Sequence, residues 1–251
     1  MSPAERDGMG ALDRAAELLG AFDAAHRELT LAALVERSGL PRSTVHRTAD
    51  KMIRLGWLDK PRDRYRVGNR LFEISSLAPI RHELRESVLP FLQDLHHATK
   101  TTVQLGVLDG TQILVVERIT GHRPMPMLEQ AGGTIPAYCS ALGRAILAFS
   151  EPATVQAVLQ AGLPARTPRT LTNPLAVLRE LTAVPDQGWA TEREEGNIGV
   201  SCVAAPVFGP LGEVVAAMSV TGPSKIIRAD RIGPAVRLAA AAASRAYARS
   251  R

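Results

Sequence analysis

The chain has 251 residues, of which 45% are apolar and 22% are charged, and its formal net charge is +5. This composition is that of an ordinary globular protein, and it excludes collagen-like, low-complexity and wholly disordered chains. The length favours two domains over one, because single hydrophobic cores usually stop growing at about this size.

Cysteine content and hydropathy indicate where the protein works. The chain contains two cysteines, Cys139 and Cys202, and no CxxC pair. A disulfide framework is therefore not expected, and a reducing cytoplasm fits best. The longest apolar stretches are far shorter than the roughly 18 to 20 residues that cross a bilayer. The first ten residues lack a cationic segment followed by an apolar run, so we expect neither a secretory signal nor a membrane partner.

The positive charge is concentrated in one short block. Residues 40–70 contain nine lysines and arginines against three acidic residues, whereas residues 1–39 contain four against seven. A local basic block beside acidic sequence is typical of a nucleic-acid contact. A solvated surface face would have the same composition, so the pattern of elements must distinguish the two.

The pattern within and before this block predicts a helix-turn-helix. Apolar residues recur at helical spacing over residues 10–25, which predicts a first helix. Thr30 is placed to cap a second helix, and Gly39 can end it in the left-handed conformation. Pro41 can open a third helix, whose inner stripe begins at Val45.

The exposed start of the third helix is polar and basic. The residues that we expect to contact DNA from it are Arg42, Ser43, Thr44, His46 and Arg47. Residues 57–60 and 65–67 predict a hairpin whose tip carries Arg62 and Arg64, which we expect to contact phosphates. The expected product is a winged helix-turn-helix that binds double-stranded operator DNA. A protein-binding winged helix is the alternative, but it leaves the two basic features unexplained.

Helices and antiparallel hairpins alternate in the rest of the chain. A helix over 70–78 is interrupted at Pro79, and a longer helix that contains Pro90 follows over 80–98. Beyond it the apolar period falls toward two, which predicts strands. The expected elements are strands 103–107 and 113–116 around an Asp109-Gly110 turn, an edge strand with Met125, Met127 and Glu129, helices 141–149 (capped by Ser140), 151–161 and 173–184, strands 200–208 and 213–221, and a helix over 229–249.

This order of elements predicts an α+β protein with three parts. We expect a winged helix-turn-helix over residues 9–70 and a linker helix over residues 71–79. Residues 80–251 are expected to form a mixed domain around an antiparallel sheet.

The last predicted hairpin brings small polar side chains to one face of the sheet. We expect Phe208 to lie opposite Glu213, and in that register Cys202 lies opposite Ser219. The other side chains expected on this face are Thr221, Ala204, Val215 and Ala217. The face is either a pocket for a small polar or aromatic ligand or a core surface whose hydroxyls bond to backbone.

An enzyme acting on a small organic acid is the rival function. Neither cysteine has a histidine nearby in the sequence, and no GxSxG, HExxH or phosphate-loop motif occurs. Glu192, Glu194 and Glu195 permit an acid/base interpretation, but three acids beside Gly196 are more often a solvated loop. We therefore expect no catalytic residue, no cofactor and no metal site.

Two groups of motifs point to one family. The N-terminal group is ALDR at 11–14, LAALVERSGLPRSTVHR at 31–47 and GWL at 56–58. The C-terminal group is LGRAILA at 142–148, GWA at 188–190, EE at 194–195, GVSCVAAPV at 199–207 and SVTGP at 219–223. The second group is not generic to helix-turn-helix proteins. Over essentially its whole length the chain resembles the IclR-type transcriptional regulators.

The resemblance implies a function and a set of binding residues. It implies a GAF-like second domain that binds a small organic effector, such as an aromatic or short organic acid, in a protein that works as a homodimer or a dimer of dimers. The effector-binding positions it implies are Ala141, Leu142, Glu192, Cys202, Ser219 and Thr221, where Glu192 replaces an aspartate that is frequent in the family. The expected protein is a transcription regulator whose operator binding or activity depends on an effector.

Overall fold

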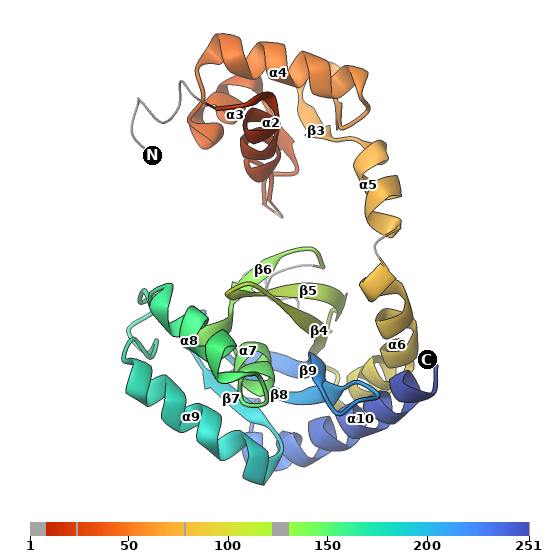
Figure 1. The fold of residues 1–251 in the computed structure, drawn as a ribbon, viewed down its shortest axis with the longest axis vertical. Coiled ribbons are helices and arrows are strands. Elements are labelled where there is room, and N and C mark those ends of the chain that lie inside the picture. Colours follow the sequence, from red (N-terminus) through yellow and green to blue (C-terminus); the bar gives the residue numbers. More distant parts are fainter. Residues whose placement is uncertain (1–8, 24, 78, 122–130, 251) are drawn as a thin grey trace. The chain divides into compact units, whose positions relative to one another are not determined.

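The computed structural model describes residues 9–23, 25–77, 79–121 and 131–250. It divides the chain into two compact units, Met1–Pro79 and Ile80–Arg251. Figure 1 shows both units. Each unit has hydrophobic core residues of its own.

The first unit is a helix-turn-helix with a small sheet. Its elements are α2 (Ala11–Gly20), β1 (Glu28–Leu29), α3 (Leu31–Ser38), α4 (Arg42–Arg54), β2 (Leu58–Asp59), the 3-10 turn η1 (Pro61–Asp63), β3 (Tyr65–Val67) and α5 (Asn69–Ser76). The predicted caps of α3 are confirmed, because the Thr30 side chain accepts the Ala33 N–H and Gly39 is left-handed at φ 67°. Leu34 and Val45 are fully buried where the helices pack.

Two features of this unit differ from the sequence prediction. The first helix ends at Gly20, five residues early, because the Asp23 carboxylate accepts the backbone N–H groups of Ala25 and His26 and forms a local turn. Strand β1 was not predicted, because two residues are too few to show the alternation of apolar and polar side chains that marks a strand. It pairs with β3 through Leu29 opposite Tyr65, and the sheet order is β1-β3-β2.

The second unit is built on a six-stranded sheet of order β6-β5-β4-β9-β8-β7, in which every neighbouring pair is antiparallel. Its elements are α6 (Pro79–Thr99), β4 (Thr102–Asp109), β5 (Gln112–Ile119), β6 (Thr134–Pro136), the 3-10 turn η2 (Ala137–Cys139), α7 (Ala141–Leu147), α8 (Pro152–Gln160), α9 (Pro174–Gln187), β7 (Ala190–Arg193), β8 (Val200–Phe208), β9 (Val214–Pro223) and α10 (Ala229–Arg249). The expected strand with Met125, Met127 and Glu129 lies outside the described residues.

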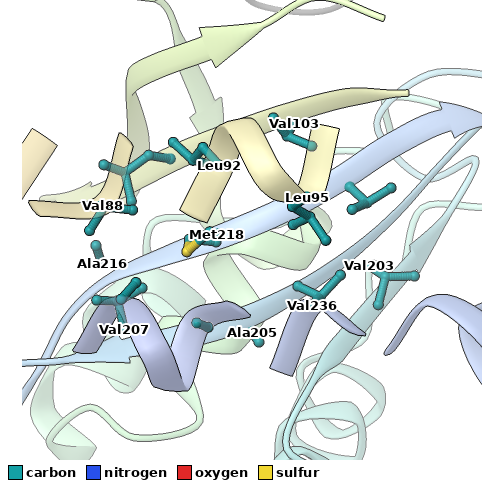
Figure 2. Packing of buried hydrophobic residues seen from close by; sticks show 14 of the residues in the cluster. Val88, Leu92, Leu95, Val103, Val203, Ala205, Val207, Ala216, Met218 and Val236 are labelled. Atoms are coloured by element: carbon teal, nitrogen blue, oxygen red, sulfur yellow. The ribbon is translucent and has the colours of Figure 1, made fainter. Parts of the chain in front are cut away.

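Helices cover both faces of this sheet. On one face α6 and α10 pack on the strands, with Leu92, Met218 and Val236 in one core (Figure 2). On the other face α7, α8 and α9 enclose a second core that includes Leu142 and Ala204. The arrangement confirms the predicted α+β fold. Because successive strand residues point to opposite faces, neighbouring residues of one strand belong to different cores.

The register of the β8–β9 hairpin differs from the prediction. Gly209 donates its N–H to the Glu213 carbonyl, which leaves a three-residue loop, and a register shift follows between Val207 and Phe208. Cys202 therefore lies opposite Thr221, and Ser219 lies opposite Ala204. The net slip is two residues, which keeps Cys202, Ser219 and Thr221 on one face. The expected placement of Val215 was wrong, because the irregularity turns it toward the core beneath α6 and α10.

Two further predictions in this unit were wrong. The first hairpin turn consists of Gly110 and Thr111, because Asp109 still pairs with Gln112 and the left-handed position, φ 58°, is Gly110. The acidic segment was expected to be a solvated loop, but its first part is strand β7 at the sheet edge, and Glu192 and Glu195 are buried. Among the described helices, none is both long enough and apolar enough to span a membrane.

Candidate functional site

The start of α4 presents polar and basic side chains above a packed helix pair. Val45 and Ala49 are fully buried and hold the helix against α2 and α3. The side chains on the outer surface are Arg42, Ser43, His46 and Arg47, which are exposed, and Thr44, which is half-buried. No acidic residue occurs in the first turn, and the Pro41 cap has no side-chain acceptor. Backbone N–H groups at this end are thus open to an anion.

Ion pairs distinguish the arginines of this unit. Arg66 lies 3.3 Å from Asp59, so its charge is compensated. Arg42 and Arg47 form no ion pair within the described part of the chain, and His46 lies 3.0 Å from Asp50 one turn further along α4. The start of α4 therefore offers two uncompensated guanidinium groups to a ligand.

The tip of the β2–β3 hairpin also presents arginines that are not compensated by a described acidic residue. Arg62 and Arg64 are exposed and, among the described residues, neither forms an ion pair. Arg62 and Asp63 are left-handed at φ 49° and 63°, so the turn holds them in a conformation that side chains seldom adopt. Lys60, in contrast, is paired: its Nζ lies 3.2 Å from Asp63 Oδ1 and over the ring of Tyr65.

The second unit contains a small cavity between α7 and the sheet. Its volume is about 50 Å³. The lining residues are Gln104 of β4, Ile135 of β6, Cys139 of η2, Ser140, Ala141 and Leu142 at the start of α7, Glu192 of β7, Gly196 and Asn197 of the following loop, Val200 and Cys202 of β8, and Thr221 of β9. The predicted binding residues Ala141, Leu142, Glu192, Cys202 and Thr221 are thus brought together.

Ser219 takes a different place from the other predicted binding residues. Its side chain is fully buried, opposite Gln104 and Ala204, but it is not among the described residues that line the cavity. Its hydroxyl forms no hydrogen bond of normal geometry within the described structure, although it lies close enough to the Cys202 thiol to act on the pKa of that group. Thr221 takes the place opposite Cys202 that was expected of Ser219, with Oγ1 3.0 Å from Cys202 Sγ and 3.4 Å from Gln104 Oε1.

Glu192 brings a carboxyl group to the cavity wall. Its Oε1 accepts the backbone N–H groups of Glu195, at 2.5 Å, and Gly196, at 3.2 Å. Burial raises the pKa of Glu192 to about 7, although the two backbone donors act in the opposite direction. The group therefore changes charge near neutral pH.

A buried ion pair supports the wall behind Glu192. Both Nη atoms of Arg144 donate to the Glu195 carboxylate, at 2.7 and 2.6 Å, while Nε donates to the Tyr138 carbonyl and Nη1 also donates to the Thr191 carbonyl. Arg144 is 1% exposed and Glu195 is 6% exposed, so this pair is structural. This pair was not predicted from the sequence, although an arginine within the apolar run of α7 was the available sign.

The two cysteines of the cavity are free and buried. Burial raises the pKa of Cys139 to about 11 and that of Cys202 to about 12. A thiol with so high a pKa is a poor nucleophile, because the thiolate is the attacking species. Gln104 and Asn197 were also missed as lining residues; a glutamine between Val103 and Leu105 in a buried strand was the sign for the first.

Family models match both units. The model of the IclR helix-turn-helix domain matches residues 11–62, and that of the bacterial transcriptional regulator IclR C-terminal domain matches residues 78–247. The chain belongs to the IclR family. IclR-family proteins are transcriptional regulators and not enzymes, so the expected family and class of function are confirmed.

Individual IclR-family relatives agree over most of the chain. The transcriptional regulator BhcR of Paracoccus denitrificans is 32% identical over 86% of this chain and 78% of its own. The transcriptional repressor IclR of Escherichia coli is 29% identical over 88% and 82%. An IclR homologue from Microbacterium hydrocarbonoxydans, solved with 4-hydroxybenzoate, superposes with a TM-score of 0.85 at 27% identity, covering 96% of this chain and 100% of that chain.

Proposed function

We propose that this IclR-family regulator binds double-stranded operator DNA through residues 9–70 and a small organic acid through residues 80–251, with residues 71–79 as the linker helix. Bound acid alters operator binding or transcriptional activity. The protein acts in the cytoplasm, where its DNA target lies, and the two free thiols suit that reducing compartment.

The start of α4 carries the DNA half of this proposal. A helix end with uncompensated arginines and open N–H groups is suited to the major groove, where arginine bonds guanine in bidentate fashion. The DNA-contacting residues are Arg42, Ser43, Thr44, His46 and Arg47 of α4, with Arg62 and Arg64 of the hairpin tip on the phosphates.

The cavity between α7 and the sheet supports the proposal that the second unit binds a small organic acid. Apolar walls from Ile135, Leu142 and Val200 with a few polar groups are the composition of a small-molecule site. The proposed contacts are Ala141, Leu142, Glu192, Cys202 and Thr221, with Ser219 reached only by a ligand that extends past Thr221. The relative that holds 4-hydroxybenzoate favours a carboxylic acid.

The cavity's size constrains the effector. A cavity of roughly 150 Å³ is needed to hold a benzene-sized ligand, and this one has about 50 Å³. A short organic acid of a few atoms fits the cavity as it stands. An aromatic acid binds only if the walls move apart, which is a conformational change that an effector can exploit.

Operator binding through α4 favours a dimer or a dimer of dimers as the working form of the protein. One recognition helix buries little surface, whereas two helices related by a dyad can contact both halves of a palindrome. An effector then acts by binding one arrangement of the assembly more tightly than another, because a ligand indifferent to the arrangement shifts nothing.

Operator binding is tested with DNA from the promoter beside the protein's own gene. We expect Arg47→Ala to weaken specific binding by about 1 to 3 kcal/mol in a fluorescence anisotropy titration, because a guanine contact is lost. Arg54→Ala, which removes the same charge at the far end of α4, is the control and should cost less. Equal operator affinity of the Arg47 variant and wild type at two salt concentrations would refute the assignment of α4.

The hairpin arginines should behave differently from Arg47. If Arg62 and Arg64 contact phosphates, each alanine variant weakens operator and random DNA alike. The slope of log affinity against log salt then falls by roughly one unit for each residue. A loss confined to operator DNA would place these side chains on bases instead.

The effector is tested by thermal stabilisation with short organic acids, aromatic acids and sugars. We expect at least one acid to stabilise the protein and Thr221→Val to reduce that effect, because the variant keeps the shape of the side chain but removes the hydroxyl at the cavity wall. A sugar that binds in preference to every acid would contradict the proposed chemical class.

A further inference from the structure

Strands β7 and β8 border a second hollow on the sheet face opposite the effector cavity. Its volume is about 470 Å³. Cys202 belongs to the core beneath α7, whereas the next residue, Val203, belongs to the core beneath α10. Thr191 lies opposite Val203, and Arg193 lies opposite Ser201, so these side chains share the α10 face. Alternate side chains of this strand pair thus point toward two different sites, and Glu192 and Cys202 border both.

The rim of this hollow is cationic. Arg193 of β7, Lys225 of the β9–α10 connection and Arg228, which precedes α10, all line it and are all exposed. Arg193 and Lys225 form no ion pair with a described residue, while Arg228 lies 3.5 Å from Asp230. Two uncompensated cations and a third that is shared with one carboxylate leave a net positive field over the opening.

The floor and one wall supply hydrogen-bond donors. Ser201 is 4% exposed and donates its hydroxyl proton to Ser224 Oγ at 3.0 Å. Because Ser224 is the acceptor of this bond, its own hydroxyl proton can be donated to a ligand. Ala229, the first residue of α10, also lines the hollow, and the preceding Arg228 provides no side-chain cap. The first N–H groups of a 21-residue helix, with the positive end of its dipole, therefore border the same space.

We propose that this hollow binds a phosphate group, either as the free ion or as the monoester of a small metabolite. Guanidinium and ammonium cations, hydroxyl donors and an uncapped helix start are the groups that bind phosphate in proteins. The volume lies within the range of roughly 300 to 1,000 Å³ that is usual for small-molecule sites.

The site goes beyond the proposed effector function and does not depend on it. Glu192 and Cys202 line both sites, but the hydrogen bonds of their carboxyl and thiol groups lie on the side of the effector cavity, whereas Arg193 and Ser201 face the α10 side. Loss of effector binding would therefore leave the phosphate site intact, and the two proposals can fail separately.

The test is isothermal titration of the full-length protein with inorganic phosphate and with glycerol 3-phosphate, in chloride buffers matched for ionic strength. We expect saturable binding of at least one of them, and affinity at least tenfold weaker in the Arg193→Gln/Lys225→Gln double variant. Both side chains are exposed, so the variant should fold. Arg245→Gln removes one exposed charge about 24 Å along α10 and is expected to change nothing.

A second variant separates a built site from a diffuse surface charge. Ser224→Ala leaves every charge in place and removes the donor next to the floor, so phosphate affinity should fall several-fold. Unchanged affinity in either the double variant or Ser224→Ala overturns the proposal, as does the absence of saturable binding to wild type. Tighter binding of the dicarboxylate succinate than of both phosphates would overturn the choice of phosphate.

Discussion

Glu192 and Glu195 show how differently two buried carboxyl groups of one segment can be held. Glu195 receives two charge-assisted hydrogen bonds from Arg144 and a backbone N–H from Leu171. Such complete pairing offsets much of the cost of burying the two charges. Glu192 receives backbone N–H groups alone, and burial leaves its pKa raised to about 7. Glu195 is thus part of the scaffold, while Glu192 is the titrating group of the cavity between α7 and the sheet.

The first prediction concerns Glu192 and pH. Because the pKa of Glu192 rises from 4.5 in the unfolded chain to about 7 in the folded protein, the folded state keeps a proton that the unfolded chain loses. This contribution to the free energy of unfolding is complete below about pH 4.5 and is lost as the pH rises to about 7. Glu192→Gln should remove up to about 3 kcal/mol of that pH dependence.

Urea denaturation at a series of pH values measures this effect. Glu180→Gln, at an exposed position of α9, is the control and should keep the wild-type pH dependence. The same slope in wild type and Glu192→Gln between pH 4.5 and 7 would show that the raised pKa is not real.

The second prediction compares two buried serines. Ser140 Oγ accepts the Gly143 N–H and caps α7, whereas the Ser219 hydroxyl forms no hydrogen bond of normal geometry within the described structure. Ser140→Ala should lower the free energy of unfolding by about 1 kcal/mol through loss of the cap. Ser219→Ala should leave it unchanged or raise it, because an unpaired buried hydroxyl is costly. Chemical denaturation of both variants decides, and a larger loss at Ser219 than at Ser140 would mean that Ser219 has an unseen partner.

At the scale of elements, the cavity depends on how closely α7 approaches η2. A Cβ atom on Gly143 would lie 2.1 Å from the carbonyl oxygen of Ala137, so only glycine allows this contact. The approach sets the position of Leu142 and of the cap residue Ser140, which both line the cavity. The shape of this cavity therefore depends on one helix-to-turn contact.

The third prediction tests that contact. Gly143→Ala should destabilise the protein by about 1 to 3 kcal/mol, because backbone must move to admit the methyl group. Gly20→Ala is the matched control: it adds the same methyl group at the end of α2, where no atom of the described residues outside the helix's own backbone lies within 4 Å. That variant should be stabilised by about 0.4 to 1 kcal/mol through reduced entropy of the unfolded chain. Thermal denaturation measures both, and similar effects of the two substitutions would contradict the role given to Gly143.

At the scale of the whole molecule, the chain consists of two units with separate cores. The core of the first unit includes Leu34 and Val45, and the cores of the second lie on the two faces of the six-stranded sheet. Proteins with several compact units commonly unfold in more than one transition. Each unit can therefore respond to its own ligand.

The fourth prediction follows from this division. In differential scanning calorimetry, operator DNA should raise the transition of Met1–Pro79, and a bound organic acid should raise that of Ile80–Arg251. At a hundredfold excess over the dissociation constant each gain is about 2.7 kcal/mol. Gly143→Ala identifies the second transition by lowering it alone. One transition that both ligands shift equally would contradict the separate folding of the units.

The helix-turn-helix and the class of fold followed from the sequence alone, because local interactions determine them. The caps at Thr30 and Ser140 and the left-handed Gly39 each depend on residues at most four positions away, and all three are confirmed. The spacing of apolar residues also distinguishes helices from strands, because the apolar side chains are the ones that become buried. The basic block of residues 40–70 is visible in the sequence because arginines close in the chain stay close in a short motif.

The register of the β8–β9 hairpin, the existence of β7 and the burial of Glu195 depend on contacts between residues far apart in the sequence. Only the tertiary structure brings those residues together. The two-residue slip of the β8–β9 register comes from a three-residue loop and a bulge near Val215. Strand β7 exists because β8 provides its hydrogen-bond partners, and Glu195 is buried because Arg144, 51 residues away, meets it there. Contacts of this kind join residues that no local pattern relates, so the burial of Glu192 and the size of the cavity became evident only in the folded chain.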